Sequence, residues 1–295
     1  MPDSLDKTGA AGNLMGAMSM VAAMALFAVE DTLLKHVSQR LPVSQILILF
    51  GLGGTFIFAC LTWQRGERIF NKDLKHPALL IRAVFEVLGR LFFTLSLALT
   101  ALSTTSAILQ ATPLLVAAAS AVIFREKING LRWSLIGLGF VGVLLVLRPG
   151  LDGFSSLSIL AVLGMIGFAG RDLATRAAPK GLSYAQLGVY GFAMLVVSGV
   201  ILLAWRGEML RPTGAETLTL ACATFVGVAA YTALTMAMRL GEVSVVTPFR
   251  YSRLLFAMIL AALIFNERPD PLELTGGAVI VLSGLALMLT ARKGR

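Results

Sequence analysis

Apolar and polar positions follow one another along this chain in long blocks. Ten apolar stretches of about 20 residues are separated by short polar breaks, and about 20 mostly apolar residues are what one membrane-spanning helix requires. Alternation with a period of two, typical of a membrane β-barrel, is absent. The expected spans are 14–35, 43–63, 79–100, 104–124, 131–147, 157–176, 183–204, 217–239, 244–265 and 272–291.

The breaks carry the residues that end helices. Pro42, Asn129-Gly130 and Pro212 to Gly214 are examples, and some links are as short as 101–103. Short links force neighbouring helices to run antiparallel. The pattern therefore predicts an all-α membrane protein with ten transmembrane helices, and no segment is typical of a soluble domain.

Composition supports the lipid bilayer as the surroundings of this chain. Of its 295 residues, 57% are hydrophobic and 14% charged, with a mean hydropathy of +0.84. A soluble domain averages about 25% charged residues. The net charge of +9 does not indicate nucleic acid, because the basic residues cluster in short links and form no basic helix face. Cys60 and Cys222 lie inside apolar stretches, which excludes a disulfide framework.

The distribution of basic residues predicts the orientation. Lys and Arg number 14 on the side that holds both termini and 6 on the other side, so both termini are expected to be cytoplasmic. Trp63, Trp133 and Trp205 all fall at the ends of apolar stretches, where aromatic rings settle at the membrane interface.

The chain contains an internal repeat with a shift of 141 residues. The pattern F-A-x-x-D-x-x-x-[KR] occurs at 27–35 and again at 168–176, and Gln45 returns as Gln186. The sequence "RGE" at 65–67 also returns at 206–208. Shared charges and glutamines at one fixed shift indicate duplication, whereas shared apolar letters would not.

Each half of the duplication contains five expected spans. An odd number makes the second half enter the membrane from the opposite side, so residues 1–150 and 151–295 are expected to be inverted five-helix repeats. Secondary transporters are often built this way, with the substrate site near the membrane midplane between the repeats. A duplication without mechanistic use is the alternative.

Nine charged side chains fall within the apolar stretches. A charge at the centre of a spanning helix costs about 2.5–3.5 kcal/mol on insertion scales, so these side chains should face protein or water. The nine residues are Glu30, Asp31, Arg82, Glu86, Arg90, Arg171, Asp172, Arg250 and Arg253.

Spacing predicts how some of these charges are arranged. Arg82, Glu86 and Arg90 are four residues apart and share one helix face. Arg171 and Asp172 are adjacent and are expected to point in different directions. Arg250 and Arg253 are three apart and share a face, on the inner side of the membrane.

Depth along the helices predicts two groups of charges. Glu30 and Asp31 belong to the outer end of the first span, and Asp172 belongs with Arg82, Glu86, Arg250 and Arg253 on the inner side. Two roles compete for the inner group. One is an ion-pair gate with an arginine free to hold a substrate carboxylate, and the other is a permanent network that joins helices.

The expected roles are as follows. Residues predicted for a gate or an ion-pair network are Glu30, Asp31, Arg82, Asp172 and Arg253. Residues predicted to line a substrate cavity are Glu86, Arg90, Gln110, Arg171, Tyr231 and Arg250. No catalytic residue, metal ligand or cofactor is expected, because no histidine has a second ligand at helical spacing and no nucleophile has a base.

The five-plus-five spans, the short links and the paired "FREK" and "FNER" ends at 124–127 and 265–268 resemble the EamA-type families of the drug/metabolite transporter superfamily. The stretch 247–277 looks most like bacterial members. The resemblance covers nearly the whole chain. It implies a bacterial inner membrane and a cavity formed mainly by helices 1, 3, 4, 6, 8 and 9, and it assigns neither a substrate nor a binding residue.

The sequence and the resemblance together favour a secondary transporter that exports small metabolites such as neutral or aromatic amino acids by alternating access. A nucleotide-binding loop is absent, so ATP does not drive transport directly. Alternatives are export or import of other metabolites or drugs, and a membrane sensor or scaffold without transport. The expected partners are a small-molecule substrate and the lipid bilayer. The oligomeric state stays open, and a monomer is compatible with the sequence.

Overall fold

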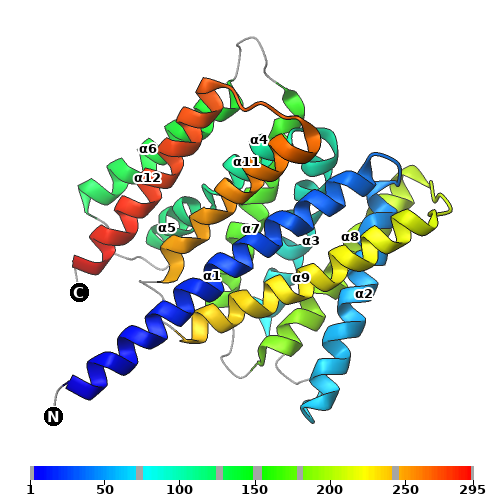
Figure 1. The fold of residues 1–295 in the computed structure, drawn as a ribbon, viewed down its shortest axis with the longest axis horizontal. Helices are drawn as coiled ribbons and strands as arrows, with labels where there is room; N and C mark the ends of the chain where they lie inside the picture. The colour runs from blue at the N-terminus through cyan, green and yellow to red at the C-terminus, as the bar shows by residue number, and fades with distance from the viewer. Residues whose placement is uncertain are drawn as a thin grey trace.

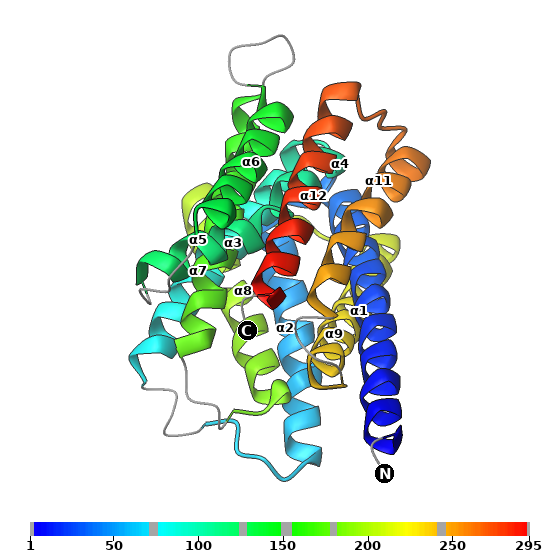
Figure 2. The ribbon, with the colours of Figure 1, turned by 90° about the vertical axis from the view of Figure 1, so that its left-hand side faces the viewer.

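The computed structural model describes residues 3–70, 76–123, 129–148, 155–177, 182–240 and 246–293, and all regular secondary structure in these ranges is helical. Figures 1 and 2 show a bundle in which α1 begins and α12 ends toward the same side. The helices are α1 (Asp3–Ser38), α2 (Val43–Gln64), α3 (Pro77–Leu99), α4 (Leu102–Leu109), α5 (Thr112–Ile123), α6 (Gly130–Leu147), η2 (Ser156–Ser158), α7 (Ile159–Ala177), α8 (Tyr184–Arg206), α9 (Gly214–Leu240), η3 (Thr247–Tyr251), α11 (Ser252–Phe265) and α12 (Pro271–Lys293).

Nine of the ten expected spans are long and apolar enough to cross a membrane within the described ranges. The remaining expected span is the third, 79–100, which corresponds to α3. This helix has 23 residues and would be about 34 Å long, which matches a hydrocarbon core of about 30 Å. Three charges, at Arg82, Glu86 and Arg90, lie in the middle part of α3 and lower its hydropathy. That α3 crosses the membrane therefore stays a prediction.

Two of the expected spans are interrupted. The fourth consists of α4 and α5, which are separated at Gln110 and Ala111 just before Pro113. The ninth begins with the 3-10 turn η3, whose second residue is Pro248, and continues as α11. A proline cannot donate a backbone hydrogen bond and so favours a change in helix geometry at these places.

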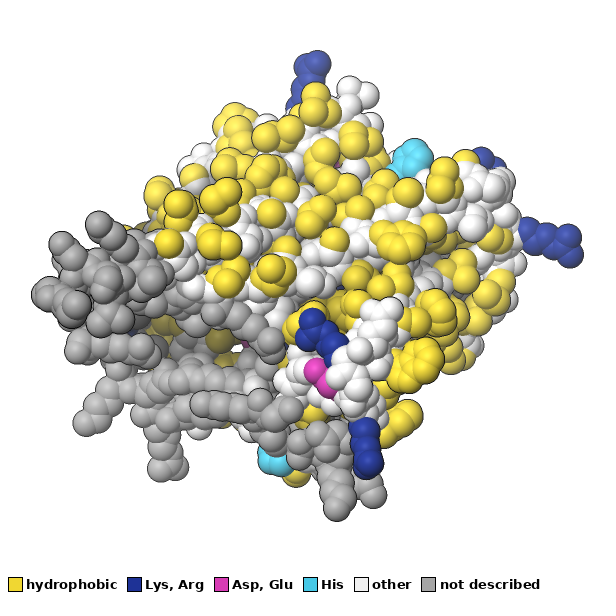
Figure 3. Space-filling model, turned by 60° about the horizontal axis from the view of Figure 1, so that its bottom comes forward, with side chains coloured by type: hydrophobic (Ala, Val, Ile, Leu, Met, Phe, Trp, Pro, Cys, Tyr) yellow, Lys and Arg dark blue, Asp and Glu magenta, His cyan; other side chains and the backbone are white. Residues whose placement is uncertain are grey.

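The outer surface of the bundle is apolar, as a lipid environment requires. Hydrophobic side chains are spread over much of the described part of the face shown in Figure 3. Phe56 on α2 and Leu263 on α11 are 71% and 74% exposed, and Trp63 and Trp205 at the ends of α2 and α8 are exposed too.

The most extensive helix pairings are α1 with α9, α2 with α8, α3 with α7, and α6 with α12, and each joins the first half of the chain to the second. Figure 1 shows the α1–α9 pair across the front and the α6–α12 pair at one edge. Two repeated glutamines make reciprocal contacts. The Gln45 amide bonds to the backbone of Leu210 beyond the end of α8, and the Gln186 amide donates to the carbonyl of Arg68 beyond the end of α2.

Glycines allow α3 and α7 to approach closely. Gly164, Gly167 and Gly170 face α3, and a Cβ added to Gly167 would lie 2.3 Å from the Cα of Gly89. Small residues at such interfaces let helix backbones meet. This contact brings the charged side chains of α3 and α7 within reach of one another.

Replacing Gly167 by alanine should therefore destabilise the protein. Helix propensity alone would favour alanine by about 1 kcal/mol, but overpacking at this backbone contact costs about 1–3 kcal/mol and should win. Thermal unfolding in detergent measures the difference. Gly137→Ala on α6 is the matched control, because nothing lies within 4 Å of a Cβ there. A Gly167→Ala melting temperature equal to or above that of Gly137→Ala would contradict the close approach of the two backbones.

Candidate functional site

Seven helical elements supply the eleven residues that the sequence predicted, and ion pairs join eight of these residues into two groups. One group is Asp31 with Arg253, and the other contains Glu30, Arg82, Glu86, Arg90, Arg171 and Asp172. The eleven residues are Glu30 and Asp31 on α1, Arg82, Glu86 and Arg90 on α3, Gln110 at the end of α4, Arg171 and Asp172 on α7, Tyr231 on α9, Arg250 in η3 and Arg253 on α11.

The first group joins α1 to α11. Arg253 Nη2 donates to Asp31 Oδ2 at 2.5 Å, and only 1% of the Asp31 side chain is exposed. The guanidinium of Arg253 also lies against the rings of Phe27 and Phe93, at 5.2 and 5.6 Å from their centroids. Such stacking replaces part of the hydration that a buried guanidinium loses.

This pair corrects the expected division into outer and inner charges. Arg253 was assigned to the inner group and Asp31 to the outer one, yet they form a direct ion pair. Depth counted along a single helix is a poor guide here, because an arginine side chain is long and helices that cross at an angle bring different levels together.

The second group is centred on Glu86. Its carboxylate lies 3.4 Å from Arg82, 3.4 Å from Arg171 and 4.0 Å from Arg90, so the predicted stacking of Arg82, Glu86 and Arg90 on one face is confirmed. Arg90 Nη1 also donates to Glu30 Oε1 at 3.4 Å. Within the described residues, Arg90 is therefore the link between Glu86 on α3 and Glu30 on α1.

Arg171 and Asp172 do not point in different directions, so that expectation is wrong. Nε and Nη2 of Arg171 both donate to Asp172 Oδ1, at 3.0 and 2.8 Å. Adjacent Cβ atoms diverge on a helix, but the arginine side chain curls back along the surface. Its guanidinium lies 4.9 Å from the ring centroid of Phe168, the repeat equivalent of Phe27.

Arg250 differs from the other four arginines. No carboxylate of the described residues lies within 4.0 Å of its guanidinium, and its interaction with Asp172 is at longer range. Gln110 donates to the carbonyls of Tyr251 at 3.3 Å and Arg250 at 3.5 Å. Gln110 thus holds the η3 turn to the end of α4, which fixes the backbone that carries Arg250.

Tyr231 on α9 lies at the margin of the second group. Its ring packs edge-on against Phe58, with centroids 5.4 Å apart. Its phenol is close enough to interact electrostatically with Arg82, Glu86, Arg171 and Asp172. The cavity roles of Tyr231 and Gln110 stay predictions.

Lys35 and Glu267 form an ion pair that was not predicted, with the Glu267 carboxylate 3.5 Å from Lys35 Nζ. Glu267 also accepts hydrogen bonds from the backbone N–H groups of Leu102 and Ser103, and so caps the start of α4. Lys35 donates to the Leu97 carbonyl at the end of α3. Both residues belong to repeated motifs, and that recurrence was the available signal. The first copy of the second motif, 124–127, lies outside the described residues.

A salt bridge at one end of the bundle joins the end of α6 to the start of α12. Arg148 pairs with Asp270, and this hydrogen bond, together with backbone N–H groups of Leu272 and Glu273, holds the pKa of Asp270 below its usual range. The contact holds the end of α6 next to the start of α12.

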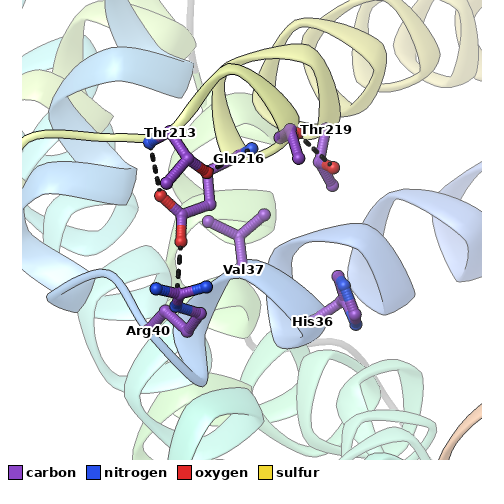
Figure 4. A pocket seen from close by; sticks show the side chains of 7 residues that line it. His36, Val37, Arg40, Thr213, Glu216 and Thr219 are labelled. Atoms are coloured by element: carbon purple, nitrogen blue, oxygen red, sulfur yellow. Dashed lines mark hydrogen bonds and ion pairs between the residues drawn. The ribbon is translucent and has the colours of Figure 1, made fainter.

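Two hollows lie outside the charged groups. A groove of about 120 Å³ lies between the end of α1 and the start of α9, where Arg40 and Glu216 point toward each other and pair at 3.2 Å (Figure 4). A hollow of about 600 Å³ between α11 and α12 is lined almost entirely by apolar side chains. None of the eleven predicted residues lines either hollow.

The chain is similar to a known family of transporters, to known transport proteins and to a solved structure. The model of the EamA-like transporter family matches twice, at residues 14–148 and 155–290. The chain is 26% identical to the pseudopaline exporter CntI of Pseudomonas aeruginosa over 94% of this chain and 97% of the relative. It is 25% identical to the S-adenosylmethionine uptake transporter of Rickettsia bellii over 72% of this chain and 73% of the relative. A crystal structure of a protein that is 18% identical aligns with a TM-score of 0.62 over 96% of this chain and 99% of that one, which supports the fold.

Proposed function

Because the chain belongs to the EamA-like transporter family, we propose that it is a secondary transporter that exports small amino acids or related metabolites across a bacterial inner membrane by alternating access. The observation that carries the substrate class is Arg250. It is an arginine without a carboxylate partner among the described residues, beside groups of paired charges.

An amino acid presents a carboxylate and an ammonium group at fixed separation. Arg250 offers a cation for the carboxylate, and Asp31 has one buried oxygen without a hydrogen-bond partner among the described residues. Phe27, Phe93 and Phe168 next to the arginines supply apolar surface. Binding sites for small metabolites commonly combine apolar walls with a few convergent polar groups.

We further propose that residues 1–150 and 151–295 are inverted repeats and that all ten spans, α3 included, cross the membrane with both termini in the cytoplasm. The reciprocal pairings of α1 with α9 and of α3 with α7 support this arrangement, as do the reciprocal contacts of Gln45 and Gln186. Ion pairs between helices of the two halves would break and reform as the repeats exchange conformations.

Purified protein in lipid vesicles tests the function. Vesicles loaded with labelled neutral and aromatic amino acids, or with S-adenosylmethionine, should release at least one of these compounds faster than vesicles without protein. Arg40→Gln at the outer margin is the matched control and should transport normally, because Arg40 is 74% exposed on its side chain and lies outside the charged groups. Accumulation only on the cytoplasmic side would make the protein an importer, and no movement of any compound in the panel would contradict the proposed substrate class.

A further inference from the structure

Glu30 is the least compensated carboxylate of the site. Its side chain is 1% exposed, and its only ion pair among the described residues is with Arg90 at 3.4 Å, a guanidinium that it shares with Glu86. By contrast, Asp31 has Arg253 at 2.5 Å and Asp172 has Arg171 at 2.8 Å. Oε2 of Glu30 has no hydrogen-bond partner in the part of the chain that the structure describes.

The unpartnered oxygen faces carbon. A Cβ added to Gly227 on α9 would lie 3.1 Å from Glu30 Oε2 and 3.0 Å from the ring edge of Phe50 on α2. Oε2 therefore lies close to the backbone of Gly227 and near the ring of Phe50, and neither group carries a charge.

The internal repeat relates the contact between Glu30 and Gly227 to an ion pair between α7 and α3. At the shift of 141 residues, Glu30 corresponds to Arg171, and Gly227 corresponds to Glu86. Arg171 and Glu86 form an ion pair at 3.4 Å between α7 and α3. The related position between α1 and α9 holds a carboxylate opposite a glycine, so α9 supplies no charge to Glu30 at this position.

We propose that Glu30 is a proton-binding site that takes up and releases one proton in each transport cycle. An ionised carboxylate packed against carbon is costly, whereas the neutral acid is tolerated. The charged groups that face Glu30 are Asp31 on its own helix, Arg90 from α3 and Arg253 from α11. Asp31 favours the neutral form of Glu30, and the two arginines favour the ionised form, so both forms are accessible.

Protonation of Glu30 changes the ionic contact between α1 and α3. The proton comes from water on one side, forms an O–H bond at the carboxyl group and later leaves to water. While it is bound, Arg90 loses its charged partner on α1 and keeps Glu86 on its own helix, so the ionic link between α1 and α3 is weakened. This step rests on the proposed transport function, because the separation of α1 from α3 matters only if the helices move in a cycle.

Infrared difference spectroscopy of the full chain in lipid vesicles tests the proton site without any substrate. The carbonyl stretch of a protonated carboxyl group in apolar surroundings should appear as the pH is lowered, and it should be lost in Glu30→Gln. Glu208→Gln, which removes an exposed carboxylate beyond the end of α8, is the matched control and should keep the band. Glu30→Asp, which keeps the acid, should shift the band rather than remove it and serves if Glu30→Gln does not fold.

The outcomes separate this inference from the proposed function. A band that persists in Glu30→Gln, or that never appears at any pH in the unaltered protein, overturns the proton site even if transport is observed. A band that titrates and disappears in Glu30→Gln supports the site even if no compound of the vesicle panel is transported. For a transported compound, Glu30→Gln should exchange it at a rate that no longer depends on pH.

Discussion

Replacing Arg250 by glutamine should raise the substrate concentration for half-maximal transport by about 10- to 100-fold, because a hydrogen bond to a charged group contributes about 1.5–3 kcal/mol. The other four arginines of the site have carboxylates within 4.0 Å, so each already has an oppositely charged partner within the protein. Arg250 has none among the described residues, and a substrate carboxylate can therefore pair with it without displacing an internal partner.

The measurement is concentration-dependent transport of a compound found with the vesicle panel. Arg250→Lys should recover part of the lost affinity, because it keeps the charge but not the two-pronged geometry of a guanidinium. Esters of the same compound, which lack the carboxylate charge, should be transported equally by the unaltered protein and by Arg250→Gln. Equal loss for acid and ester would mean that Arg250 serves the structure of η3 rather than the substrate.

Helix positions and local charge stacking could be predicted from this sequence because they depend on short-range periodicity. Runs of about 20 apolar residues require helices in lipid. The spacing of Arg82, Glu86 and Arg90 places them on one face whatever the tertiary structure, and the structure confirms that Glu86 lies beside both arginines.

Partners across the fold could not be predicted in the same way. Asp31 and Arg253 are 222 positions apart and meet only because α1 packs against α11. Lys35 and Glu267 meet for the same reason. The repeat indicates which residues occupy related places, but it does not give the angle at which two helices cross, and that angle decides which side chains touch.

The error at Arg171 and Asp172 has a different cause. The directions of two Cβ atoms were used to judge where two side chains end. Arginine has enough rotatable bonds for its guanidinium to reach a neighbouring carboxylate. An apolar environment favours this ion pair, because a charge without a partner is costly there.

Variants of the Asp31–Arg253 pair can distinguish an ion-pair gate from a permanent network. The comparison is between the stability of each variant and its transport activity. Asp31→Asn alone leaves the Arg253 guanidinium buried without its charged partner, and breaking such a pair costs about 3–5 kcal/mol. Arg253→Gln alone leaves the Asp31 carboxylate, which is 1% exposed, in the same situation. Both single variants should lower the melting temperature in detergent strongly, whereas Arg40→Gln, which breaks an exposed pair, should cost less than about 1 kcal/mol.

The double variant Asp31→Asn with Arg253→Gln should recover most of the stability, because two neutral amides can hydrogen-bond and neither leaves a buried charge. Its transport should not recover if the pair opens and closes during the cycle, because a neutral pair no longer holds α1 to α11 with the same strength in one state and releases it in the other. Recovery of stability and transport together would show that the pair only joins the helices, since a permanent contact has no need of charge.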